Sequence, residues 1–228
     1  MYSQQLFMGL DFIHTKLITH RDIKPQNLFV NDDVGELKIG DFGCAIRLFP
    51  KESYSPYQIT RFYRPPELLF GSEQYSTKVD IWSAICTMVE MVYGKPLFIG
   101  VDWTEQASKI LDCLGAPTSS DLANMNIKKV NCKARTSKGV MPENGSDLIS
   151  SSMYELMRLN LIYDPNKRMT GREIVKHAYF APLYDTNNYI RSNGTQLIKQ
   201  KNTKKEGSRS DKSGPVSFDY LYVLKLPS

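Results

Sequence analysis

Four polar side chains near the start of this chain have the types and the spacing that phosphoryl transfer requires. Asp22 places a carboxylate where it can accept the proton of an attacking hydroxyl, and Lys24, two residues later, can set an ammonium on the transferred phosphate. Asn27 and Asp41 offer an amide oxygen and a carboxylate, hard oxygen ligands of the kind that magnesium prefers. Because this chemistry depends on positioning and charge neutralisation, the four residues form a candidate catalytic site.

The elements around these residues predict a β-hairpin that brings Asn27 and Asp41 to the same end. An apolar run at 28–30 and an alternating run at 36–39 flank a turn-forming stretch. Over residues 1–16, leucine and isoleucine recur at helical spacing. Further helices are expected at about 77–93, 104–114, 147–161 and 170–177, with prolines between them.

Seven stretches agree in type, order and spacing with one protein family: HRDIKPQN at 20–27, DFGCA at 41–45, YQITRFYRPPE at 57–67, DIWS at 80–83, GKPLFIG at 94–100, LDCLGAPT at 111–118 and DPNKRMT at 164–170. They resemble the C-terminal lobe of eukaryotic protein kinases, most closely the glycogen synthase kinase 3 branch of the proline-directed Ser/Thr kinases. The resemblance implies a protein-kinase-like fold, C-terminal lobe only, mainly α with a small β-hairpin, over residues 1–184. We expect 185–228 to be a polar basic tail without fixed structure, with a short apolar end. The alternative, an ordinary loop at 20–22 that caps a helix, is disfavoured by the agreement of the motifs.

By this resemblance, Asp22 is the general base and Lys24 contacts the phosphate of ATP. Asn27 and Asp41 are the implied Mg²⁺ ligands, so ATP and Mg²⁺ are the expected cofactors. Thr60 resembles the activation-segment hydroxyl that hydrogen-bonds near the catalytic aspartate and lysine. Its presence favours protein substrates phosphorylated on Ser or Thr.

Other residues match structural positions of the same family. Glu67 and Arg168 correspond to a buried ion pair, and Asp80 to the carboxylate that braces the catalytic loop. Arg21 belongs to the catalytic-loop motif, and in this family it is also one of the basic residues that read a substrate already phosphorylated. At the lysine position of that basic cluster the chain has Ile46, which weakens the expectation of such a preference.

Tyr57 resembles the activation-loop tyrosine that this family phosphorylates on itself. A phosphate there would carry about two negative charges and attract arginines, and Arg61 and Arg64 are close in sequence. From the residues alone, a packed loop tyrosine explains the position equally well; the resemblance favours the phosphorylation site.

The sequence lacks the Gly-rich phosphate loop, the strand lysine and the helix glutamate of the family. We therefore expect that the chain starts partway into the fold and has little or no activity alone. Two hypotheses follow. One is a Ser/Thr protein kinase, and the other is a truncated, inactive kinase that acts as a binding, scaffold or decoy protein. The resemblance implies a candidate site for a scaffold protein at the helix 103–114. The family's aromatic-rich loop on the other side of that groove is replaced at 127–146 by a basic stretch without aromatic residues, for which a solvated loop is the preferred interpretation.

Composition limits the other classes of function. The net charge is +5, and residues 199–212, with six basic and two acidic residues, contribute +4 of it, so no basic face for nucleic acid is expected on the folded part. The longest apolar stretch, 81–93, is too short to span a bilayer. The four cysteines have neither metal-site nor C-x-x-C spacing and favour a reducing compartment, cytoplasmic or nuclear.

Overall fold

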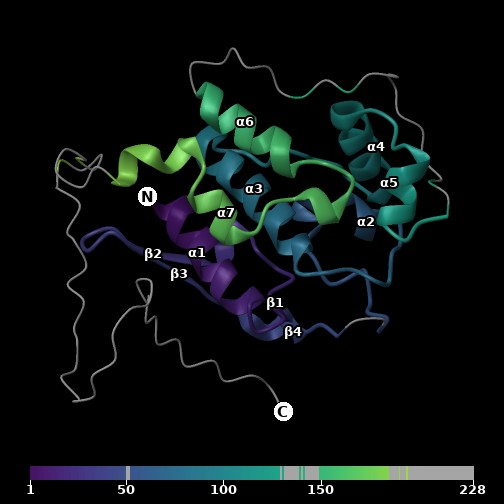
Figure 1. The fold of residues 1–228 in the computed structure, drawn as a ribbon, viewed down its shortest axis with the longest axis horizontal. Coiled ribbons are helices and arrows are strands. Elements are labelled where there is room, and N and C mark those ends of the chain that lie inside the picture. Colours follow the sequence, from purple (N-terminus) through teal and green to yellow (C-terminus); the bar gives the residue numbers. More distant parts are fainter. Residues whose placement is uncertain are drawn as a thin grey trace, which may run out of the picture.

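The computed structural model describes residues 1–49, 52–128, 130, 139, 141, 149–184, 190 and 194, and shows a mainly helical fold with two small antiparallel sheets (Figure 1). The predicted fold class, mainly α with a small β-hairpin, is confirmed. The predicted boundary at residue 184 stays a prediction, because nearly all of the tail lies outside the described residues.

Helix α1 (Tyr2–His14) carries the predicted helical pattern onto one buried face. Leu6, Phe7, Leu10 and Ile13 are buried at spacings of three and four residues. The helix packs against α3 (Lys78–Tyr93), α7 (Gly171–Val175) and the strand β3 (Glu36–Ile39). It therefore fixes the point from which the chain enters the catalytic loop.

Helix α3 (Lys78–Tyr93) lies at the centre of the fold and packs against α1 and α6 (Ser151–Asn160) (Figure 1). All residues from Val79 to Val89 are buried, so the helix is covered on every side, as its apolar sequence requires. It ends at Gly94, whose φ of 71° is the left-handed conformation that glycine adopts readily at a helix C-terminus.

The two sheets lie beside α1, and their strands flank the loops that carry Asp22 and Asp41. Strands β2 (Leu28–Asn31) and β3 (Glu36–Ile39) form the predicted hairpin, with Leu28 opposite Ile39. Strands β1 (Ile18–Thr19) and β4 (Ile46–Arg47) form a second pair that the sequence did not predict. A two-residue strand carries too little pattern to be recognised from sequence.

The remaining elements frame α3. The α-helices are α2 (Pro66–Leu69), α4 (Trp103–Leu114), α5 (Ser119–Asn124), α6 (Ser151–Asn160) and α7 (Gly171–Val175). The 3₁₀ turns are η1 (Pro25–Asn27), η2 (Phe42–Cys44), η3 (Arg61–Tyr63), η4 (Pro165–Lys167) and η5 (Ala178–Tyr184). The predicted helices over 77–93, 104–114 and 170–177 are therefore present, and α6 is shorter than the predicted 147–161, of which 147 and 148 lie outside the described residues.

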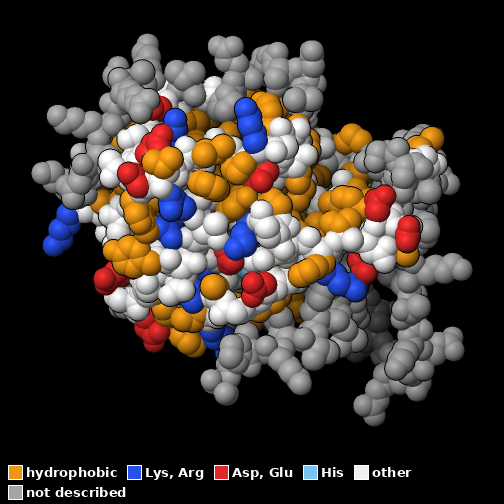
Figure 2. Space-filling view, turned by 180° about the vertical axis from the view of Figure 1, so that it is seen from behind, with side chains coloured by type: hydrophobic (Ala, Val, Ile, Leu, Met, Phe, Trp, Pro, Cys, Tyr) orange, Lys and Arg blue, Asp and Glu red, His pale blue; other side chains and the backbone are white. Residues whose placement is uncertain are grey.

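The surface mixes both signs of charge. On the face drawn in Figure 2, acidic and basic side chains are interspersed among apolar ones. Within the described part of the chain, none of the helices is long and apolar enough to cross a membrane.

Candidate active site

The catalytic loop is held by one buried carboxylate at the start of α3. Asp80 is fully buried and accepts hydrogen bonds from the backbone N–H groups of His20 and Arg21, each at 2.8 Å. Arg21 needs this support, because its φ of 65° lies in the left-handed region that side chains other than glycine rarely adopt. Its guanidinium donates to the carbonyl of Cys44 at 2.7 Å, which ties the loop to the segment after Asp41.

His14, at the end of α1, is a further support that the sequence analysis missed. Its Nε2 lies 2.9 Å from Oδ2 of Asp80, the oxygen that also accepts the N–H of His20. The pair joins α1 to α3 across 66 residues of sequence. Helical periodicity places His14 at the end of α1 but carries no signal for a partner so far along the chain.

Asp22, Lys24 and Thr60 meet in one cluster of short hydrogen bonds. Lys24 Nζ donates to Asp22 Oδ2 at 2.7 Å and to Thr60 Oγ1 at 3.0 Å, and Thr60 Oγ1 donates to Asp22 Oδ1 at 2.6 Å. Burial alone would raise the pKa of Asp22, and the hydrogen bonds from Lys24 and Thr60 outweigh it, so this pKa lies below its usual value. The carboxylate is therefore ionised at neutral pH and ready to accept a hydrogen bond from a substrate hydroxyl.

Asn27 directly precedes β2 and Asp41 comes after β3, so both lie at the same end of the hairpin. The Gly40 N–H donates to the Asn27 carbonyl at 2.9 Å, next to the paired Leu28 and Ile39. The side-chain nitrogen of Asn27 donates to the carbonyl and to Oδ2 of Asp22, at 2.8 and 3.0 Å, which leaves its amide oxygen available to a cation.

This pair of oxygens fits part of a magnesium site. Asp41 is exposed at the start of η2, and its Oδ1 accepts the N–H of Gly43 at 3.3 Å. Magnesium is usually bound by one or two protein oxygens, with water and substrate phosphates as the other ligands. Among the described residues there is no group of three or more His, Cys, Asp or Glu side chains that could hold a metal by itself.

His20 connects the catalytic loop to the turn that carries Asp41. Its Nε2 lies 2.9 Å from the carbonyl of Gly40, and its ring meets the edge of Phe42 at a centroid distance of 4.8 Å. The sequence analysis placed His20 in a motif without giving it a task. In the structure it joins the loop that carries Asp22 to Gly40 and Phe42, the two neighbours of Asp41 in the chain.

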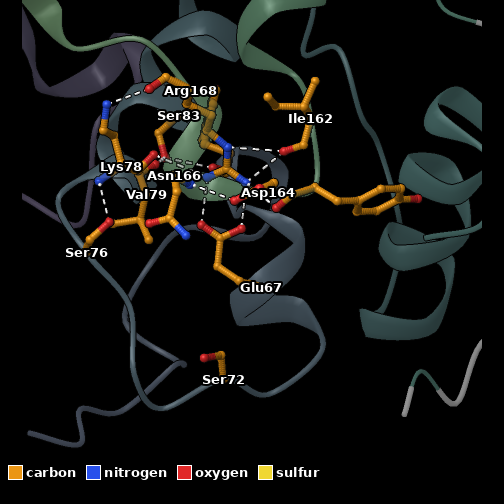
Figure 3. Close-up of polar contacts among 12 residues, drawn as sticks. Glu67, Ser72, Ser76, Lys78, Val79, Ser83, Ile162, Asp164, Asn166 and Arg168 are labelled. Carbon is orange, nitrogen blue, oxygen red and sulfur yellow. Dashed lines mark hydrogen bonds and ion pairs between the residues drawn. The ribbon is translucent and has the colours of Figure 1, made fainter. Parts of the chain in front are cut away.

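Glu67 and Arg168 form a bidentate ion pair beneath the activation segment. Both Glu67 oxygens accept guanidinium N–H groups at 2.7 Å, and the two side chains are almost fully buried. The same guanidinium donates to the carbonyls of Ile162, Tyr163 and Lys78, as far as 3.4 Å (Figure 3). The pair links α2 to the segment before α7 across 101 residues of sequence, so its role here is to hold the fold together.

Tyr57, Arg61 and Arg64 lie close together in the chain, but Tyr57 is exposed whereas Arg64 is buried. Tyr57 is 68% exposed, and its phenol interacts electrostatically with Arg64. Arg64 donates to the carbonyls of Ile59 and Tyr57, whereas Arg61 donates to the carbonyls of Gly100 and Val101. Both arginines are thus bound to backbone oxygens, and their predicted contact with a phosphate on Tyr57 stays a prediction.

Comparison with known proteins agrees with this geometry. The family description "Protein kinase domain" matches residues 1–180. Serine/threonine-protein kinase gskl-1 of Caenorhabditis elegans is 37% identical over 198 residues, which is 86% of this chain and 54% of the relative. Protein kinase gsk31 of Schizosaccharomyces pombe is 40% identical over 188 residues, 82% of this chain and 49% of the relative.

The chain thus spans about half the length of the curated relatives it matches. The family match covers far more than half of the 228 residues and includes every residue of the Asp22 cluster, the hairpin and the Glu67–Arg168 pair. The chain belongs to the protein kinase family, and it is similar to the glycogen synthase kinase-like members of that family.

Proposed function

We propose that this chain is the catalytic lobe of a serine/threonine protein kinase, which transfers the γ-phosphate of ATP to Ser or Thr side chains of protein substrates. The observation that carries the proposal is the cluster of Asp22, Lys24 and Thr60, closed by three hydrogen bonds of 2.6–3.0 Å. A carboxylate, an ammonium and a hydroxyl in mutual contact, beside Asn27, supply the groups that phosphoryl transfer uses on the acceptor side.

In this mechanism each side chain has one task. Asp22 accepts a hydrogen bond from the attacking hydroxyl and takes its proton as the bond to the γ-phosphorus forms and the bond from that phosphorus to the departing ADP breaks. Lys24 places a positive charge beside the transferred phosphoryl group, and Thr60 fixes the carboxylate against rotation. Asn27 and Asp41 would hold Mg²⁺, which neutralises the phosphate oxygens when it is bound.

The activation segment supplies the proposed regulation. Tyr57 is exposed and its phenol is close to Arg64, so a phosphate there would meet a positive charge. We assign Tyr57 as a phosphorylation site on this basis, with Arg61 and Arg64 as the nearby cations. We propose a cytoplasmic or nuclear location, which rests on the cysteine pattern alone.

The test is phosphate transfer by the protein purified from its natural source and by its variants. With labelled ATP, Mg²⁺ and a basic protein substrate, Asp22→Asn should lower the rate by about 10²–10⁴-fold, the usual contribution of a general base. Asp33→Asn, on the exposed hairpin turn, is the matched control and should keep the wild-type rate. Equal activity of Asp22→Asn and the wild type would overturn the proposal.

A second candidate is a protein-binding role without catalysis. It is favoured by Ile99 and Val101, which are 47% and 79% exposed just before α4, at the helix for which a scaffold contact was predicted. Mg-ATP distinguishes the two candidates, because a ligand that binds only the folded state raises the unfolding temperature. A kinase should show this rise together with transfer, and a binding protein should show neither.

A further inference from the structure

The loop before α4 contacts the second half of the activation segment, the stretch of the chain from 41 to 67. Arg61 donates to the carbonyls of Gly100 and Val101, the first at 3.1 Å. Arg64 lies with its guanidinium carbon 3.9 Å from the ring centroid of Trp103, the first residue of α4. The activation segment is thus held at two points, by the loop before α4 through Arg61 and by α4 itself through Arg64.

Trp103 contacts the activation segment with a face and an edge. Arg64 stacks on the indole, and the ring of Tyr57 meets it at 5.4 Å with an interplanar angle of 81°. Arg64 is only 5% exposed, although Trp103 itself is 38% exposed, so the guanidinium is withdrawn from water. This burial and the nearby Arg61 lower the pKa of Arg64 to about 10, and cation–π contacts are strongest for such desolvated cations.

The backbone that Arg64 holds is the part that carries Thr60. Arg64 Nε donates to the Ile59 carbonyl at 2.8 Å, and Nη2 donates to the Tyr57 carbonyl at 3.0 Å. Thr60 follows directly and donates to Asp22 at 2.6 Å. A displacement of Arg64 would therefore reach the catalytic carboxylate through a few fixed bonds.

Several hydrogen bonds hold the start of α4, where Trp103 lies. The Gly100 N–H donates to Oε1 of the fully buried Gln106 at 2.9 Å. A β-carbon at Gly100 would lie only 2.3 Å from the backbone nitrogen of Gln106, so the two segments are in close contact. Asp102 caps α4 by accepting the Glu105 N–H at 2.8 Å, and Glu105 accepts the Val101 N–H at 2.9 Å. A fixed helix start can hold an arginine in one place, whereas a mobile loop cannot.

We propose that Trp103 is a positioning residue that holds Arg64, and through it the Thr60 region, in place while Tyr57 carries no phosphate. In loops that phosphorylation orders, the phosphate dianion is the partner of an arginine. Here the π face of the indole is the partner of Arg64. The inference concerns the regulation of the proposed site and in that sense rests on the proposed function. Its test uses no ATP, so the two can fail separately.

The test is backbone hydrogen exchange in the phosphatase-treated protein, followed at the amides of Tyr63, the last residue of turn η3, and of Arg64 directly after it. Trp103→Ala should speed their exchange about thirtyfold, which is the effect of losing one desolvated cation–π contact. Trp103→Phe keeps an aromatic face and should recover most of the protection. Val101→Ala removes an exposed apolar side chain but keeps the carbonyl that binds Arg61, and should match the wild type.

Tyr57→Phe distinguishes the contact between Trp103 and Arg64 from a phosphate-dependent mechanism, because the variant keeps the ring on Trp103 and cannot be phosphorylated. Its exchange should stay within about twofold of the wild type. Unchanged exchange in α3 would show that Trp103→Ala is still folded, and a variant that unfolds is replaced by Trp103→Leu in the same assay. Two results would overturn the proposal. One is exchange at the wild-type rate in a folded Trp103→Ala or Trp103→Leu variant. The other is rapid exchange in the unphosphorylated wild type that only phosphorylation slows.

Discussion

Replacing Glu67 by Gln is the most direct test of how this fold is held together. The substitution keeps the shape of the side chain and removes the negative charge that faces Arg168. In the native protein both Glu67 oxygens accept N–H groups at 2.7 Å, and both side chains are shielded from water. After the change, an N–H of the new amide would point toward one nitrogen of the guanidinium.

The expected cost follows from what remains around Arg168. The carbonyls of Ile162, Tyr163 and Lys78 still accept its N–H groups, but they carry no charge. Leaving one charge of a buried pair uncompensated costs about 3–5 kcal/mol. For a protein of this size, about 2–4 °C of melting temperature corresponds to 1 kcal/mol, so the melting temperature should fall by about 6–20 °C.

The assay is urea unfolding followed by circular dichroism, with melting as a second measurement. Glu36→Gln is the matched control, because Glu36 pairs with Lys38 at 3.1 Å on the surface and its loss should change the free energy of unfolding by less than about 0.5 kcal/mol. A cost below about 1 kcal/mol for Glu67→Gln, with an unchanged dependence on urea, would refute the reasoning. It would mean that water reaches Arg168 once its partner is gone.

Two other predictions concern ionisable groups. The pKa of Asp22 is lowered in the folded protein, so its ionised form stabilises the fold above its unfolded pKa, about 3.9, and this contribution is lost as the pH falls through the folded pKa. The difference in the free energy of unfolding between the wild type and Asp22→Asn should therefore narrow as the pH falls from about 5 to about 2. A constant difference would contradict the lowered pKa of Asp22. Burial raises the pKa of Cys86 and raises that of Cys113 to about 12. Of these three described cysteines, a thiol reagent at pH 8 should therefore modify the partly exposed Cys44 before Cys86 and Cys113, as read by peptide mapping. Equal labelling of the three would show that the core opens readily.

The local part of the site could be predicted from the sequence because short spacing fixes it. Asp22, Lys24 and Asn27 lie within six residues, so one loop brings their side chains together. The hairpin over 28–39 was also predictable, since an apolar run, a turn and an alternating run leave few other arrangements. The pairing of Leu28 with Ile39 then places Asp41 beside Asn27.

The contacts between distant segments required the tertiary structure unless a family resemblance supplied them. The resemblance pointed to Glu67 with Arg168, but nothing in the sequence pairs His14 with Asp80 across 66 residues, or Arg64 with Trp103. Helical periodicity says which face of a helix is buried, not which polar group on another element meets its end.

The sequence by itself therefore determined the polar groups of the candidate site, and the packing of the helices decided what holds them. The turns and strands around Asp22 and Asp41 follow from neighbouring residues, whose preferences act over a few positions. The supports on α3 and α4, Asp80 and Trp103, depend on how whole helices pack around the buried core, where burial and shape act across the entire chain. Only the folded molecule brings Trp103 onto Arg64 and so joins the start of α4 to the catalytic carboxylate.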